Sequence, residues 1–314
     1  MLIILAGAAC IYGVSLRTTT FAEKATTDAD RQITVAEDTK GVFFHPVYPF
    51  DAKGFSEGTN QAETQAVGTF PSGMRGGIIP HHTLPSFLIA GFFRQLSAQH
   101  PKRIILIGPN HPDKGRSKLL TSRADWQTPF GTVATDTASV DALMRDDGAS
   151  IDDARLSEEH SVATIMPYIK YYLPDATVVP IILKSSVTFD ESEALSGDLA
   201  KMMTDSDTVL VAAVDFSHYL TSREAQENDT MTQRLIQSFE SRNLFGLTSD
   251  YLDSPPSIAT LLETMKRVGA KRAGLVANTN SGLLTNDTVS GVTSYFVFTF
   301  SSEMKVSGAS ASRN

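Results

Sequence analysis

Residues 103–111, Arg-Ile-Ile-Leu-Ile-Gly-Pro-Asn-His, decide the fold of this 314-residue chain. The unbroken aliphatic run at residues 104–107 is typical of a strand buried on both faces, which occurs where helices cover both sides of a mostly parallel sheet. The same signature returns at residues 177–183 and 208–214, and a shorter version stands at residues 76–80. These runs predict the central strands of an α/β sheet.

Segments with a helical spacing of apolar residues lie between these runs. In residues 85–99, for example, Leu88 and Phe92 are four positions apart and would share one helix face. Further helices are expected at residues 140–145, 161–172, 192–203, 222–241 and 257–268, and final strands at 273–278 and 292–300. This alternation predicts an α/β fold with a single domain, in which helices flank a mixed, mostly parallel sheet.

The first 40 residues differ from the rest of the chain. The apolar stretch from Leu2 to Leu16 has the length of a signal-peptide core and is short for a membrane span. We therefore expect residues 1–16 to be a signal peptide or N-terminal anchor and residues 17–40 a polar linker. Residues 41–302 would form the α/β domain and residues 303–314 a disordered tail. The protein is expected to be exported or anchored to a membrane through its N-terminus; a buried first strand and a cytoplasmic protein are the alternative.

Charge and cysteine content restrict the partners and the kind of metal site. The formal net charge of −8 argues against a nucleic-acid partner, which needs a basic surface. Cys10 is the only cysteine, so a cysteine-based zinc site and an intramolecular disulfide are excluded. Any metal must then be held by imidazoles, carboxylates or neutral oxygens. We expect a small-molecule or peptide ligand, and the oligomeric state stays open.

Histidines follow three of the predicted strands, at the ends where open α/β sheets bind ligands. They are His81, His111 and His218. A single histidine at a strand end is usually capped or solvated, but three at equivalent ends favour a shared metal or acid/base site. We expect His81 and His111 to hold a metal at the ends of two neighbouring strands. His45 and His100 lack this context and are expected at the surface.

Two further clusters carry candidate groups. Glu159 and His160 open a predicted helix, so either the acidic residue favours the helix dipole or it orients His160 into the crevice. Asp253 precedes another predicted helix. It lies either in a turn with Ser257 as the helix N-cap or at the site as a carboxylate ligand. Two histidines and one carboxylate form the usual ligand set of non-haem Fe(II) sites.

Together these motifs resemble the Memo family, also called AmmeMemoRadiSam system protein B. The matching pieces, in order, are residues 79–82, 105–111, 126–131, 158–161, 167, 214–218 and 291–300. The family's Pro-His-Ala-Gly is Pro-His-His-Thr in this chain, with His82 in place of the alanine. The resemblance implies a fold like that of the LigB-like class III extradiol dioxygenases, which place a non-haem iron at the strand ends of a mixed sheet.

The resemblance also implies roles for individual residues. His81 and His111 match the family's two metal histidines, and Asp215 and His218 would face the metal. Some members use a late cysteine as the third ligand, and Asp253 stands at that place here. A carboxylate makes the site harder, which favours Fe(II) over copper, with zinc as a further alternative.

Three functions are compatible with these features. The first is a non-haem iron oxidoreductase of dioxygenase type, with the metal on His81, His111 and Asp253. The second is a non-catalytic protein that binds a metal or a peptide, and the third is a metal-assisted hydrolase. In the oxidoreductase, His218 would be the acid/base group or a fourth ligand. The expected catalytic residues are His218, Asp215, His160 and Glu159.

Overall fold

The computed structural model describes residues 43–65, 68 and 70–302. The predicted signal peptide or anchor, the linker at residues 17–40 and the tail at residues 303–314 lie outside the described residues. Within the described part of the chain, no helix has the length and apolarity needed to cross a membrane.

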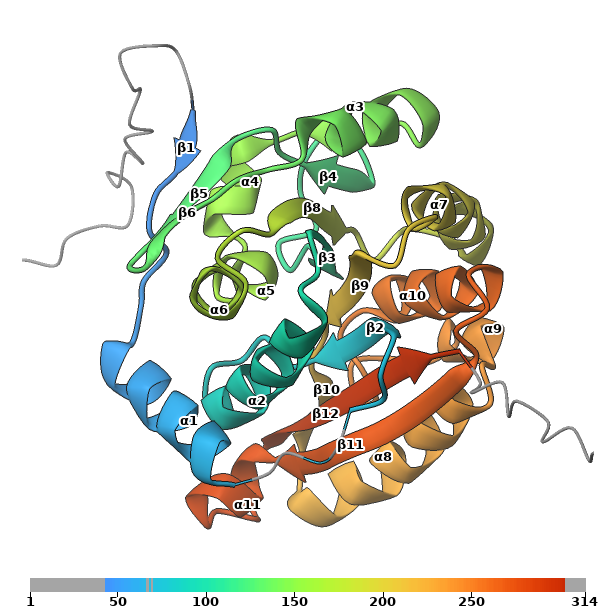
Figure 1. The fold of residues 1–314 in the computed structure, drawn as a ribbon. Coiled ribbons are helices and arrows are strands. Elements are labelled where there is room, and N and C mark those ends of the chain that lie inside the picture. Colours follow the sequence, from blue (N-terminus) through green and yellow to red (C-terminus); the bar gives the residue numbers. More distant parts are fainter. Residues whose placement is uncertain (1–42, 66–67, 69, 303–314) are drawn as a thin grey trace, which may run out of the picture. The chain divides into compact units, whose positions relative to one another are not determined.

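A nine-stranded mixed sheet forms the centre of the fold, as the sequence predicts (Figure 1). Its middle strands run parallel in the order β2 (Met74–Ile79), β9 (Thr208–Ala213), β3 (Arg103–Pro109) and β8 (Thr177–Leu183). These are the aliphatic runs of the sequence, and nearly all their residues are buried. The long strand β12 (Val292–Ser301) pairs antiparallel with β2.

Shorter or peripheral strands complete the sheets. The main sheet also contains β10 (Phe216–Leu220), β11 (Arg272–Asn280), β4 (Leu119–Thr121) and β7 (Ser150–Ile151). A separate three-stranded sheet contains β1 (Phe44–His45), β5 (Asp125–Thr128) and β6 (Gly131–Val133). Most of these strands were not predicted, because two to five residues are too few to show a period.

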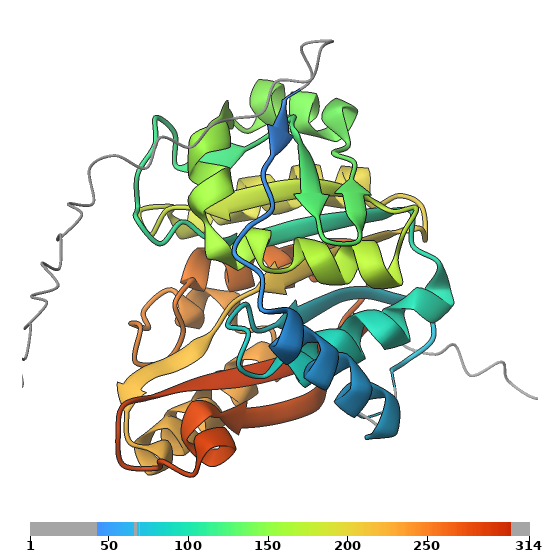
Figure 2. The same ribbon diagram turned by 90° about the vertical axis from the view of Figure 1, so that its left-hand side faces the viewer.

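Helices cover both faces of the main sheet (Figures 1 and 2). On one face lie α2 (Ser86–Leu96), α5 (His160–Ala163) and α6 (Met166–Tyr172), with α1 (Ala52–Thr64) packed on α2. On the other face lie α3 (Thr137–Asp146), α7 (Phe189–Met202), α8 (Ser222–Gln237) and α10 (Pro255–Arg267). Successive residues of β3 point to opposite faces of the sheet. Leu106 packs in the core on the α2 face, and Ile107 packs in the core on the α10 face.

The predicted helix at residues 161–172 is divided into α5 and α6. Thr164 and Ile165 separate the two helices, and the hydroxyl of Thr164 donates to the carbonyls of His160 and His81. The predicted helix at residues 222–241 likewise ends at Gln237. Helix α1 was not predicted, since its buried face includes Gly58 and Thr59 and therefore lacks a clear apolar stripe.

His45 is buried, and the expectation of a surface position was wrong. Its side chain stacks on Trp126 with ring centroids 3.8 Å apart. Its Nδ1 and Nε2 each lie 2.7 Å from a serine hydroxyl, those of Ser157 and Ser122. The three neighbours belong to segments far from His45 in sequence, so its own flanking residues gave no sign of burial. His100 is exposed, as expected.

Candidate metal site

The histidines at the ends of β2 and β3 face a common space, although their strands are not neighbours. Strand β9 lies between them, which corrects the expected arrangement. His81 follows β2 and His111 follows β3, while β9 is followed by Asp215. The strand β9 thus places the carboxylate of Asp215 between the two histidines, at the carboxyl edge where open sheets bind ligands.

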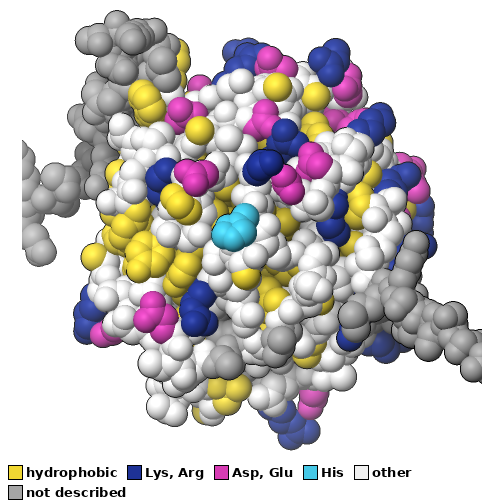
Figure 3. Space-filling model, viewed as in Figure 1, with side chains coloured by type: hydrophobic (Ala, Val, Ile, Leu, Met, Phe, Trp, Pro, Cys, Tyr) yellow, Lys and Arg dark blue, Asp and Glu magenta, His cyan; other side chains and the backbone are white. Residues whose placement is uncertain are grey.

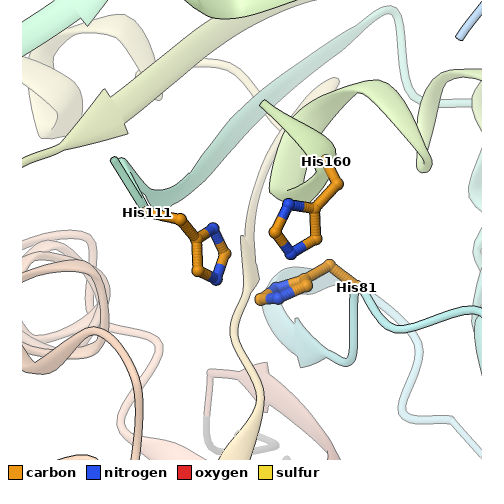
Figure 4. Close-up of side chains that lie close together, drawn as sticks. All are labelled: His81, His111 and His160. Carbon is orange, nitrogen blue, oxygen red and sulfur yellow. The ribbon is translucent and has the colours of Figure 1, made fainter. Parts of the chain in front are cut away.

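A third imidazole joins these two (Figure 4). His160, the first residue of α5, stacks on His111 with ring centroids 4.0 Å apart, and its ring lies 5.0 Å from that of His81. Each histidine offers a ring nitrogen, and these three atoms lie within 4.8 Å of one another. His160 was expected to be a catalytic residue, whereas the structure places it in the same group as His81 and His111.

Hydrogen bonds orient the two strand-end imidazoles. The Nδ1 atom of His81 lies 3.1 Å from the carbonyl oxygen of Ala213, so it carries the hydrogen and donates it. The Nδ1 atom of His111 lies 2.7 Å from Oε1 of Glu159, and it donates to that carboxylate. In the neutral form each ring then has its lone pair on Nε2. This second-layer arrangement is the usual one around histidines that bind metals.

Asp253 supplies a carboxylate oxygen beside both Nε2 atoms. Its Oδ2 lies 3.5 Å from Nε2 of His81 and 3.6 Å from Nε2 of His111. Ligand atoms bonded to one metal at about 2.1 Å lie roughly 3.0–3.4 Å apart at tetrahedral or octahedral angles, so a small adjustment would fit all three to one ion. Its other oxygen, Oδ1, is buried and has no hydrogen-bond partner within the described residues. The donor set therefore fits a divalent metal.

The backbone around Asp253 holds its position. The N–H of Asp253 donates to the carbonyl of Asp215 at 3.1 Å. Ser254 caps α10 by accepting from the N–H of Ser257, so the expectation that Ser257 is the cap was wrong. Pro255 occupies the first turn of the helix, where a residue without an N–H costs no hydrogen bond.

Glu159 connects the segment after β3, which carries His111, with the start of α5, which carries His160. Its carboxylate accepts from the backbone N–H of His111 at 2.8 Å, from the ring of His111, and from the N–H of Ser161 at 2.9 Å. Nδ1 of His160 is farther away, at 3.4 Å. Glu159 therefore orients His111 more directly than His160, the partner expected from the sequence. It also caps α5, so both interpretations of this cluster hold in part.

Asp215 lies beside His81, whereas His218, which was also expected to face the metal, lies apart from the histidine group. Oδ1 of Asp215 accepts from the backbone N–H of His81 at 3.1 Å, and its Oδ2 lies 3.6 Å from Nε2 of the same residue. His218 lies in β10, and its Nδ1 is 3.3 Å from the carbonyl of Ser249. It is therefore outside the three-histidine group, because the chain turns after Asp215 into a strand that pairs with β12.

The comparison with known families matches the part of the chain that contains this site. Residues 64–297, which contain every group described above, match the family described as Memo-like protein. The chain belongs to the Memo-like family. The resemblance seen in the sequence motifs is thereby confirmed.

Relatives of known sequence come from archaea and bacteria. A MEMO1 family protein of Methanothermobacter thermautotrophicus is 25% identical over 68% of this chain and 80% of its own length. A MEMO1 family protein of Desulfurococcus amylolyticus is 25% identical over 78% of this chain and 92% of its own length. Among solved structures, an uncharacterized protein from Escherichia coli K12 aligns with a TM-score of 0.48 and 11% identity, over 71% of this chain and 99% of that one.

His82, the departure from the family's motif, lies beside the site and not in the histidine group. Its Nδ1 is 2.6 Å from the hydroxyl of Tyr295, which is fully buried in β12. Burial lowers the pKa of His82, and the nearby Asp215 opposes this effect. A hydrogen bond to a rigid strand residue thus fixes the imidazole at the edge of the site.

The charges of the histidines differ in the absence of metal. Burial lowers the pKa of His111, but hydrogen bonds to Asp253 and Glu159 outweigh burial and raise it to about 10. For His160, burial and the positive charge of His111 lower the pKa to about 4. At pH 7, His111 is therefore protonated, donates to Glu159 and lies 3.6 Å from the carboxylate of Asp253, whereas His160 is neutral.

Metal binding at this site is expected to release about one proton per ion at pH 7, because Nε2 of His111 must lose its hydrogen before it can coordinate. Apparent affinity should rise about tenfold per pH unit between about pH 7 and 9. Calorimetric titration in buffers of different ionisation enthalpy measures the released protons. His100→Ala is the control, because His100 is exposed, and it should release as many protons as the wild type. A wild-type protein that binds metal at pH 7 without releasing a proton would show that His111 is not deprotonated on binding.

Proposed function

We propose that this protein is a metal-dependent oxidoreductase that holds one divalent ion, preferably Fe(II), between His81, His111 and Asp253. The observation that carries the proposal is the convergence of two Nε2 atoms on one carboxylate oxygen at 3.5 and 3.6 Å. Two imidazoles and one carboxylate with open positions form the ligand set of non-haem Fe(II) oxygenases. An iron bound there would supply a Lewis-acidic, redox-active centre.

The surrounding residues would prepare the site for a ligand. Glu159 and the carbonyl of Ala213 keep Nε2 of His111 and His81 directed at the ion. His160 is neutral at pH 7 and lines the adjacent pocket, so it is the group that would accept a proton from a bound small molecule. The nearby carboxylate of Glu159, 3.4 Å from Nδ1 of His160, would stabilise the imidazolium formed.

A second candidate is a metal-assisted hydrolase. The observation in its favour is the presence of three histidines in one group, since three imidazoles and an activated water form one common type of catalytic zinc site. In that case His160 would be a ligand, and Asp253 would accept a proton from the water.

Metal analysis and two activity assays separate these functions. Protein purified without oxygen and loaded with Fe(II) or Zn²⁺ should contain about one ion per chain. Oxygen consumption with a panel of catechols supports the oxidoreductase, and chelator-sensitive ester or phosphate hydrolysis with zinc supports the hydrolase. Stoichiometric metal with neither activity would favour a non-catalytic protein that binds a small molecule or peptide. Failure to bind Fe(II), Zn²⁺ or Cu²⁺ would contradict the proposal as a whole.

A further inference from the structure

A segment that lies before the family match lines the pocket beside the histidine group. Residues 45–55, which we call the N-terminal strap, run from β1 to the first turn of α1 and precede the matched residues 64–297. The buried His45 fixes one end of the strap on Trp126. Phe55 fixes the other end, with its ring centroid 4.8 Å from those of Phe130 and Tyr168.

The strap and the histidines share one pocket. A pocket of about 320 Å³ is bounded on one side by His81, His160 and Thr164 and on the other by the strap. The apolar part of the pocket lining consists mainly of aromatic side chains and prolines, most of them from the strap. These are Tyr48, Pro49, Phe50, Phe55, Pro167 and Tyr168. Figure 3 shows hydrophobic side chains gathered on the same side of the molecule, over α6 and the segment that precedes α1.

The size and lining of the pocket restrict its ligand. Its volume is at the lower end of the range for small-molecule sites, which suits one ring better than two. Aromatic walls favour an aromatic ligand, because ring edges and faces attract one another beyond simple burial. Polar side chains line the pocket toward the histidines, and the carboxylate of Asp51 lines it at the strap. An anionic oxygen substituent would therefore point away from Asp51, toward the histidines and a metal bound there.

Tyr48 offers a further polar contact in this pocket. Within the described residues its hydroxyl has no hydrogen-bond partner, and the side chain is only partly buried. Tyr48 lines the same pocket as His81 and His160. Burial raises the pKa of Tyr48, and the negative charge of Glu159 raises it further. At neutral pH the hydroxyl is protonated and available as a donor to a ligand oxygen.

We propose that the N-terminal strap determines the ligand of this protein: a compound with a single aromatic ring whose anionic oxygen group faces His81 and His160 and accepts a hydrogen bond from Tyr48. This inference rests on the proposed function, because the metal would hold the oxygen group. The ring preference comes from Phe50 and its neighbours in the strap. It therefore depends on residues that precede the matched residues 64–297.

The test compares two carboxylates that differ only in their ring, benzoate and cyclohexanecarboxylate, by calorimetric titration of the metal-loaded protein. Benzoate should bind about tenfold more tightly, as expected for contacts with more than one aromatic side chain. Phe50→Leu keeps most of the volume but removes one of the aromatic rings, and should lower the ratio to about threefold. Tyr48→Phe should weaken both ligands equally and leave the ratio unchanged.

Matched controls are available close by. Tyr171→Phe removes a hydroxyl, and Phe43→Leu removes a ring, from half-exposed residues that do not line the pocket. Both should behave like the wild type, and Trp126 fluorescence reports whether each variant keeps the strap anchored. Equal affinity for the two carboxylates, no binding of either, or an unchanged ratio in Phe50→Leu would overturn the inference. Metal content is measured separately. A protein that binds no metal would contradict the proposed function, whereas the ratio of the two carboxylate affinities tests the role of the strap.

Discussion

Replacing His111 with alanine will lower metal affinity by at least about 100-fold, since even changes to groups that only support a ligand cost 10–100-fold. His111 supplies one of the two Nε2 atoms that face Asp253, and its ring also stacks on His160. Affinity is best measured by competition with a chromophoric chelator at a fixed pH. The wild type should hold about one ion per chain, and the variant almost none.

His100→Ala is the matched control for this variant. His100 is exposed and lies at the end of the short helix of residues Ser97–Gln99, away from the strand ends. Its replacement should leave metal affinity unchanged. Thermal unfolding of both variants shows whether they are folded. A folded His111→Ala protein that retains wild-type metal content would exclude His111 as a ligand.

Replacing Glu159 with glutamine will lower the stability of the metal-free protein by about 3 kcal/mol near pH 6. The carboxylate is 1% exposed and accepts three hydrogen bonds, including a charged one from His111. Removing one partner of a buried ion pair is costly, but Asp253 still lies beside His111 and His111 is 32% exposed, which puts the cost at the lower end of the usual range. Urea unfolding in the presence of a chelator measures the difference.

The pH dependence of this difference follows from the two shifted pKa values. Burial raises the pKa of Glu159, but its hydrogen bond with His111 and the charge of His111 outweigh burial and lower it to about 2. Its contribution is therefore complete above its ordinary value near 4.5 and is lost as the pH falls toward 2. The pKa of His111 is raised, so its contribution is complete below 6.5 and is lost as the pH rises through about 10.

The stabilisation by Glu159 should thus be greatest between about pH 4.5 and 6.5 and decline on both sides. Glu158→Gln is the control, because Glu158 is exposed and its only ion pair within the described residues is with Arg155. Its effect should stay within about 0.5 kcal/mol. A Glu159→Gln effect that is small, or that does not vary between pH 6 and pH 10, would mean that the pair with His111 is not formed.

The central sheet was predictable because its strands are buried on both faces. The strands β3, β8 and β9 have a polar residue only at their first position, and β8 was predicted with the bounds that the structure gives it. Strand order was not predictable in the same way. Sequence separation does not show that β9 inserts between β2 and β3, since that order depends on which helices cross over the sheet.

The candidate site was partly predictable for the same reason. His81 and His111 follow buried strands directly, so the fold determines where their side chains can lie. The partners of these histidines depend on longer connections. Glu159 reaches His111 across 48 residues, and Asp253 reaches both Nε2 atoms from the start of α10. No local pattern distinguishes such a carboxylate from an ordinary residue at a helix terminus.

The strap residues show a further limit of sequence reasoning. Tyr48 and Phe50 lie among prolines, in a stretch with neither strand nor helix periodicity. Their place in the pocket depends on His45 being held by Trp126 and two serines from elsewhere in the chain. Such contacts between distant segments become visible only in the folded structure.

X-ray absorption spectroscopy of the Fe(II)-loaded protein tests the central claim most directly. If the ion is bound by His81, His111 and Asp253, the spectrum will show only nitrogen and oxygen neighbours, at about 2.0–2.2 Å, together with the outer-shell scattering of at least two imidazoles. The imidazole contribution should fall in the His111→Ala protein, if any iron remains bound. A wild-type spectrum without imidazole scattering would place the metal elsewhere and contradict the account.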